Sequence, residues 1–233
     1  GMTLPKKVCL DGYVTVLTKL EIGRYFLNSL FCATISVLIS LTHISMSSYV
    51  IARMRFRGRG LITALLMSTL FIPGIALTFP VYNLVNKLGL YNTRWGLIFI
   101  YSCSSIAMSF FVIRNYFATI PRELEEAARI DGANGWQTLW KITIPNVMPS
   151  ITICMFLTLT NSFKLFDQNL ALTGGDPNHA TEMLALNIYN NFYARSGAAW
   201  KGIGQAKAVV FCIMVIAISM IQLRLTRSKE VQQ

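Results

Sequence analysis

Residues 124–150, LEEAARIDGANGWQTLWKITIPNVMPS, form the most polar long stretch of an otherwise apolar chain. Glu126 stands beside two alanines, Ala127 and Ala128, and Asp131 would share the alanine face of a helix. Small side chains let the surface of another protein approach closely, and a nearby carboxylate can pair with an arginine of that protein. The pattern is therefore typical of a docking element and not of a reacting centre.

A catalytic set of residues is not evident in the sequence. The two histidines, His43 and His179, have no Ser and Asp partners in an arrangement typical of nucleophilic catalysis, and no glycine-rich phosphate-binding loop with a lysine occurs. We therefore expect a chain that is not an enzyme and that binds no cofactor itself. The scattered cysteines indicate neither a disulfide framework nor a metal site; they are Cys9, Cys32, Cys103, Cys154 and Cys212.

The composition places the chain in a membrane. Of its 233 residues, 54% are hydrophobic and 13% are charged, and the mean hydropathy is +0.50. A soluble domain of this length would need more charge on its surface. The net charge of +11 does not indicate nucleic-acid binding, because no basic stripe is interleaved with aromatic residues. In a membrane protein, Lys and Arg collect in the loops.

Apolar runs of about 20 residues are long enough to cross roughly 30 Å of hydrocarbon as helices, and five such runs are found. Each is too long and too uniformly apolar for a strand. We therefore expect an all-α, polytopic transmembrane helical bundle that forms a single domain over residues 1–233. The predicted spans are residues 25–49, 61–81, 95–112, 145–163 and 208–223.

Positive charge indicates the orientation of these spans. The densest cluster is ARMRFRGRG, residues 52–60, which we place in the cytoplasm because short cytoplasmic loops are enriched in Lys and Arg. Five crossings then place the polar loop of residues 114–144 and the C-terminal tail in the cytoplasm. Residues 164–207 and the N-terminus are expected on the extracytoplasmic side.

A first short helix is expected at the start of the polar stretch. Pro121 suits the first turn of a helix, where its missing N–H is not needed. Strong helix formers follow, with charge pairs expected from Arg122 to Glu126 and from Glu125 to Arg129.

A second short helix is expected directly after the first. Gly132 is the expected end of the first helix, and Asn134 is the expected N-cap of the second. Trp136, Leu139 and Trp140 recur at helical spacing, which predicts that they bury against the membrane domain.

The spacing within this stretch resembles a known motif. EAARIDG is followed, after nine residues, by ITIP, as in the EAA motif of type I ATP-binding-cassette importer permeases. In that family, the loop forms a coupling helix that sits in a groove of the cytoplasmic ATPase. The resemblance therefore implies an ATPase-coupling role for Glu126, Ala127, Ala128, Asp131, Gly132 and Pro145.

The resemblance covers nearly the whole chain. SSYVIARMRFRGR resembles the exit of a span in that family, and RELEEAARIDGANGW is similar to the form of the motif in its carbohydrate group, with maltose-type permeases the best match. LFIPGIALTFPVYNLVNKLGLYNTRWGLIFIY is similar to a span-loop-span of the same group, in which a Pro-Gly pair breaks a helix. The family has six spans, so one more span is expected than the five found here. Which member of the permease pair this chain resembles stays open.

The resemblance also implies a function and partners. The implied function is that of a permease subunit of an ATP-driven carbohydrate importer, forming half of the translocation path in a bacterial cell membrane. The implied partners are a second related permease, a cytoplasmic ATPase dimer that binds ATP and Mg²⁺, and an extracytoplasmic sugar-binding protein. Membrane lipid surrounds the complex, and no nucleic acid is expected.

Polar residues at the outer end of the fourth span are candidates for the path of a sugar. Asn161, Lys164 and Asp167 provide hydrogen-bonding groups beside Phe163, and a sugar site needs such groups next to flat apolar faces. An equal alternative is that these side chains anchor the end of the span at the level of the lipid headgroups. His43, inside the first span, is a candidate either for the path or for one hydrogen bond to a neighbouring helix.

The long outer loop contains TGGDPN, which predicts a turn, and then EMLALNIYNNFY, whose spacing predicts a partly buried amphipathic helix. In the family that the chain resembles, outer loops dock the solute-binding protein. The resemblance therefore implies that Asp167, Asp176 and Tyr189 lie near that docking surface.

Two other classes of function compete with the permease. A secondary transporter or channel driven by an ion gradient would usually have carboxylates within its spans or an internal repeat, and neither is evident. A structural scaffold protein of the membrane would not need the coupling motif.

Overall fold

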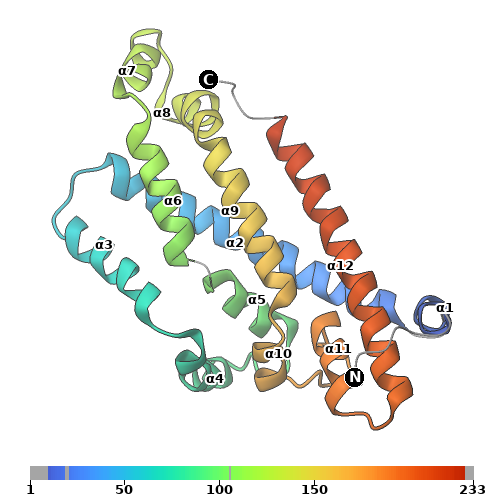
Figure 1. The fold of residues 1–233 in the computed structure, drawn as a ribbon. Coiled ribbons are helices and arrows are strands. Elements are labelled where there is room, and N and C mark those ends of the chain that lie inside the picture. The colour runs from blue at the N-terminus through green and yellow to red at the C-terminus, as the bar shows by residue number, and fades with distance from the viewer. Residues whose placement is uncertain (1–9, 19–20, 105, 229–233) are drawn as a thin grey trace, which may run out of the picture.

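The computed structural model describes residues 10–18, 21–104 and 106–228, and every regular element in these residues is helical (Figure 1). The all-α prediction is therefore confirmed. The α-helices are α1 (Asp11–Thr18), α2 (Ile22–Arg53), α3 (Arg59–Ser68), α4 (Thr78–Lys87), α5 (Arg94–Cys103), α6 (Ile106–Thr119), α7 (Arg122–Ile130), α8 (Gly135–Thr138), α9 (Ile144–Lys164), α10 (Asp167–Leu172), α11 (Leu184–Tyr193) and α12 (Ala198–Arg227).

Three continuous helical segments in the described residues are long and apolar enough to cross a membrane. They are Ile22–Arg53, Gly135–Lys164 and Ala198–Arg227, and they contain the predicted spans 25–49, 145–163 and 208–223. A fourth candidate is formed by α5 and α6 together, which are bent by 47° relative to each other. The prediction of a span at residues 95–112 falls on this bent pair.

The predicted span over residues 61–81 is divided in the structure. α3 is extended by the 3₁₀ turn Thr69–Phe71, and after a break at Pro73 the chain continues as a second 3₁₀ turn, Gly74–Leu77, and then as α4. Ile72 has an extended conformation with φ −90° and ψ 115°. A residue before proline is restricted to such conformations, so the run cannot continue as one helix.

The long helix α2 is the centre of the bundle and packs against α5, α6, α9 and α11. Its buried side carries small residues that let neighbouring backbones approach. Ser36 Oγ donates a hydrogen bond to the carbonyl of Ile98 over 3.3 Å, and Ser48 Oγ donates to the carbonyl of Phe110 over 3.4 Å. Larger apolar side chains fill the core beside these contacts: Val37, Ile44, Phe110, Ile113 and Phe163.

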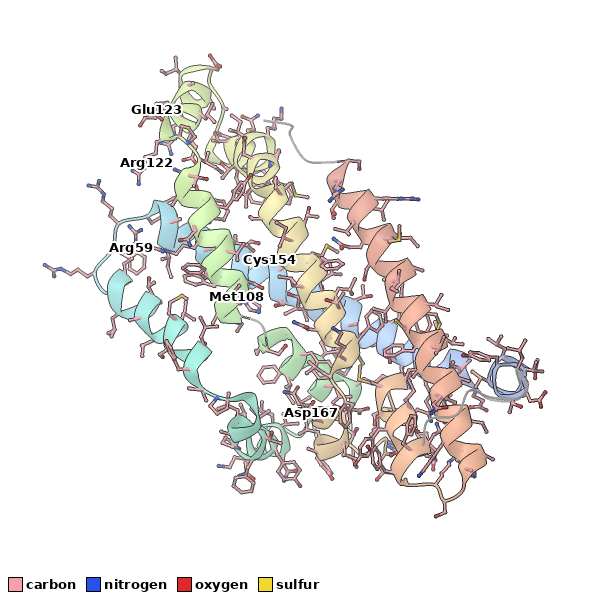
Figure 2. The ribbon with its side chains drawn as sticks, viewed as in Figure 1. Arg59, Met108, Arg122, Glu123, Cys154 and Asp167 are labelled. Atoms are coloured by element: carbon pink, nitrogen blue, oxygen red, sulfur yellow. The ribbon has the colours of Figure 1, made fainter. Side chains whose placement is uncertain are left out.

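The polar loops lie at opposite ends of the bundle. In Figure 1, α7 and α8 gather at one end, which we call the α7 end, and α4, α10 and α11 gather at the other. Figure 2 shows Arg59, Arg122 and Glu123 toward the α7 end and Asp167 toward the opposite end. The loops 114–144 and 164–207, predicted on opposite sides of a membrane, are thus separated by the length of the spans.

Candidate functional site

The predicted first helix of the polar stretch is α7, and its end is set by Gly132. Gly132 has a φ of +84°, a left-handed conformation that residues with a side chain rarely adopt. The N–H of Ala133 donates to the carbonyl of Ala128 over 2.9 Å, which satisfies a carbonyl that the helix itself leaves unpaired. The predicted helix end is confirmed.

Asn134 caps the following helix, α8, as the sequence predicts. Its Oδ1 accepts a hydrogen bond from the N–H of Gln137 over 2.8 Å, and Gln137 Oε1 accepts one from the N–H of Asn134 over 2.9 Å. This reciprocal pair is a capping box, which satisfies two backbone donors at the start of a helix.

A π-helical turn, η3 (Leu139–Thr143), joins α8 to α9. The predicted second helix therefore runs on into a membrane span instead of ending before it. Pro145 stands at the start of α9, and Pro149 lies within it. Each proline lacks the N–H that a regular helix would donate to the carbonyl four residues earlier, which weakens the hydrogen-bond ladder at this junction.

The residues predicted to couple to an ATPase lie mostly on the outward side of α7. Glu126, Ala127 and Asp131 are exposed, and the neighbouring Ile130 is 86% exposed. Ala128 is the buried residue of the helix and packs toward the bundle. Of the remaining two candidates, the glycine that ends α7 is also exposed, whereas the proline of α9 is half-buried and lies beyond η3.

The tryptophans of this region do not bury as the sequence predicts. Trp136 is 68% and Trp140 is 53% exposed, and their rings meet edge to face with centroids 5.6 Å apart. The prediction is wrong because Thr138 and Thr143 occupy the side of the segment that faces the bundle, and both are buried. Leu139 is half-buried. The two indole rings therefore extend the apolar surface beside α7, and exposed patches of this kind often mark interaction sites.

The carboxylate of Glu125 faces the bundle. Its Oε1 lies 3.5 Å from Nε of Arg53, the last residue of α2, and both side chains are nearly buried. Arg53 Nη2 also donates to the carbonyl of Ile120 over 2.9 Å. The partner of Glu125 is therefore on another helix, and not the Arg129 predicted from spacing within α7. No sequence pattern signals this contact.

The residues predicted for a solute path divide into two groups. Asn161, Lys164 and Asp167 are exposed near the end of the bundle opposite α7. Phe163 is instead a core residue, with its ring centroid 6.5 Å from that of Phe26 and 6.1 Å from that of Phe211. In this conformation the ring of Phe163 presents no open face to a solute.

A cavity of about 550 Å³ lies between α9 and α12. Lys164 and Thr160 line it from α9, and Ser219 lines it from α12. Apolar side chains form the rest of the wall, including Phe211. The wall of the cavity is therefore almost wholly apolar, and Thr160, Lys164 and Ser219 are its polar members.

The outer loop contains the predicted helix, α11, whose buried residues include Leu184 and Leu186. Tyr189 is half-buried, with its ring stacked on Phe166 at 5.0 Å and close to Tyr193 at 4.7 Å. Asp176 lies in the turn before α11 and is exposed.

Both histidines have hydrogen-bond partners. His43 Nε2 lies 3.1 Å from the carbonyl oxygen of Ser102 on α5, which supports the alternative of a single bond to a neighbouring helix. His179 Nδ1 bonds to the carboxylate of Glu182, which is 1% exposed. No motif marks Glu182, which opens the amphipathic run EMLALNIYNNFY directly before α11. Cys9 lies outside the described residues.

Known proteins of several organisms are similar in sequence to this chain. Residues 44–229 match the sequence model of a family described as the binding-protein-dependent transport system inner membrane component. The probable starch degradation products transport system permease protein AmyD of Thermoanaerobacterium thermosulfurigenes is 43% identical over 138 residues, which are 59% of this chain and 46% of that protein. The diacetylchitobiose uptake system permease protein NgcG of Streptomyces coelicolor is 32% identical over 166 residues, 70% of this chain and 55% of that protein.

The chain spans about half the length of these curated relatives. Its fold is similar to that of a solved bacterial ABC transporter involved in the import of the acidic polysaccharide alginate, with a TM-score of 0.79 and 23% sequence identity. That match covers 95% of this chain and 81% of the solved chain.

Proposed function

The chain belongs to the family of binding-protein-dependent transport system inner membrane components, and from this we propose that it is the permease subunit of an ATP-driven carbohydrate importer. As a family member it is a multi-pass protein of the cytoplasmic membrane. Membership argues against the alternatives of a secondary transporter, a channel or a scaffold. ATP and Mg²⁺ are bound by a separate ATPase subunit, because this chain has no glycine-rich phosphate-binding loop.

The observation that carries the proposal is the two-sided environment of α7. One side, with Ala128 and Glu125, packs on the bundle, while Glu126, Ala127 and Ile130 point away from it. A short amphipathic helix held in this way offers a small, partly apolar face with a carboxylate at its edge. Such a face suits a groove on an ATPase that supplies an arginine.

Coupling then consists of a rigid-body displacement. Closure of two ATPase subunits around ATP would move α7, and α7 would move the helices packed on it, which changes the side of the membrane to which the path opens. A single permease of this kind encloses only part of a path. We therefore propose a second related permease beside it.

The carbohydrate class of the substrate is supported by the names of the two relatives, which refer to starch degradation products and to diacetylchitobiose. Asn161, Lys164 and Asp167 are the proposed contacts in the path, because they are exposed polar groups at the end of α9 and the start of α10, and Lys164 lines the cavity between α9 and α12. Asp176 and Tyr189 are the proposed contacts of a sugar-binding protein, together with Asp167.

A charge reversal on the outward side of α7 tests the function. The Glu126→Lys variant is expected to lower ATP hydrolysis stimulated by the binding protein by about tenfold or more, because the coupling free energy is lost. The measurement uses the complete complex, purified through a tag on this chain and reconstituted in lipid. Glu21→Lys is the matched control, since Glu21 is an exposed glutamate at the opposite end of the bundle and bonds only its neighbour Arg24 among the described contacts.

Two results would reject the proposal. The first is purification of the wild-type chain from its native membrane without any ATPase subunit. The second is wild-type stimulated hydrolysis in the Glu126→Lys complex.

A further inference from the structure

Arg53 ends α2 and connects several parts of the α7 end through one side chain. Its Nε lies 3.5 Å from Glu125 Oε1 on α7, and its Nη2 donates to the carbonyl of Ile120, just before α7, over 2.9 Å. The same Glu125 oxygen accepts a hydrogen bond from Thr143 Oγ1 in η3 over 3.4 Å. One ion pair thus joins the end of α2, the turn between α6 and α7, and the π turn before α9.

Burial distinguishes this pair from the other charges nearby. The side chains of Arg53 and Glu125 are 8% and 14% exposed, whereas Arg55, Arg57 and Glu123 are exposed. Removing two charges from water costs free energy that their attraction only partly offsets, so a well-packed apolar pair would hold the helices together at least as well. A buried ion pair here is better explained by a role in fixing the position of α7 than by stability.

The backbone links between α7 and the bundle are not continuous α-helix. Pro121 precedes α7 with a ψ of 137°, so α6 and α7 are separate helices. After α7 come the left-handed Gly132 and the π turn before Pro145. Prolines and π turns are the usual places where helices bend. A displacement of α7 therefore depends on side-chain contacts to reach the bundle.

We propose that Arg53 is a positioning residue for ATPase coupling, which through Glu125 fixes α7 to the end of α2 so that α7 and α2 move together. This inference rests on the proposed function, because α7 must first be the helix that the ATPase moves. α2 packs against α5, α6, α9 and α11, so its displacement reaches the whole bundle. Thr143 gives Glu125 a second partner and brings the start of α9 into the same unit.

The test compares neutral variants in the complete, reconstituted complex. Arg53→Gln and Glu125→Gln each remove one charge, and the double variant removes both and leaves no buried charge without a partner. We expect each of the three to keep basal ATP hydrolysis and assembly but to lower stimulated hydrolysis and sugar uptake by about tenfold. If Arg53 acts through Glu125, the double variant loses no more than either single variant.

Matched controls are Arg55→Gln and Glu123→Gln, which neutralise exposed neighbours on the same loop and the same helix. Both are expected to couple as the wild type does. Arg53→Lys keeps the charge but not the planar guanidinium that bonds the carbonyl of Ile120 while lying beside Glu125, so it is expected to recover part of the loss.

Either of two results would overturn the inference. One is wild-type stimulation in the double variant, which would make the pair dispensable for coupling. The other is a loss in the double variant that equals the product of the two single losses, which would mean that the residues act independently. A failure of the proposed function itself is recognised separately, because the wild-type complex would then show no stimulated hydrolysis at all.

Discussion

Lys207 of α12 donates a hydrogen bond to Asn187 Oδ1 of α11, although both side chains are buried in the outer part of the bundle. Asn187 Nδ2 in turn donates to Glu182 Oε1 over 3.1 Å, and Asn190 Nδ2 donates to the same oxygen over 3.0 Å. The amide of Asn187 thus lies between a buried ammonium and a buried carboxylate. It orders α11 and the loop before it against α12.

Replacing Lys207 with Met is expected to destabilise the outer region. The change leaves the acceptor Asn187 Oδ1 without its charged donor, and a hydrogen bond to a charged group contributes about 2 kcal/mol. The midpoint of thermal unfolding in detergent should fall by about 5 °C. Lys201→Met, which changes an exposed residue of the same helix, is the control and should leave the midpoint unchanged.

The side chain of Asn28 on α2 binds the backbone of the outer loop. Its Nδ2 donates to the carbonyls of Ala180 and Glu182, each over 3.1 Å. In Asn28→Ala both carbonyls lose a partner, so amide hydrogen exchange in residues 176–184 is expected to accelerate by about tenfold or more. Asn161→Ala, at an exposed position, should not change exchange there. Unchanged protection in Asn28→Ala would show that other contacts suffice to hold the loop.

Gly132→Ala tests whether the left-handed turn after α7 matters for coupling. A Cβ at this position would meet no atom within 4 Å, so its cost comes only from the φ of +84°, about 1 to 2 kcal/mol. We expect the turn to change conformation and stimulated ATP hydrolysis to fall. Gly135→Ala is a matched control, because that position is equally open and has no left-handed φ. Equal activity of the two variants would contradict the prediction.

Gly204 of α12 lies so close to α11 that any larger residue is expected to destabilise the packing of these two helices. An added Cβ would lie 2.9 Å from Phe192 Cε2 and 3.3 Å from Asn191 Cβ, and both of these residues are on α11. Gly204→Ala should therefore destabilise the chain by about 1 to 2 kcal/mol through overpacking. Gly202→Ala, two residues earlier, meets no atom within 4 Å and should be neutral or stabilising, since alanine favours a helix. Thermal unfolding of the two variants side by side checks this contrast.

Local features of this protein follow from its sequence. The helical class, the long apolar helices that contain residues 25–49, 145–163 and 208–223, the end of α7 at Gly132 and the cap at Asn134 all depend on residues that are close along the chain. Length, hydropathy, a glycine with left-handed φ and a side chain that bonds its own backbone act over one or two turns. The break near Pro73 is also a local effect, because a proline restricts the conformation of the residue before it. It divides the run of residues 61–81 into separate helices.

The tertiary structure decided which side of each helix is covered and which charges meet. A span that is apolar all round has no polar side to show its orientation, so nothing in the sequence places Phe163 in the core. The exposure of Trp136 likewise depends on the packing of its segment against the bundle. The pairing of Arg53 with Glu125 joins helices that are remote in sequence, and no local rule reports such a contact. It depends on the crossing of α2 with the turn between α6 and α7, which only the packed bundle fixes.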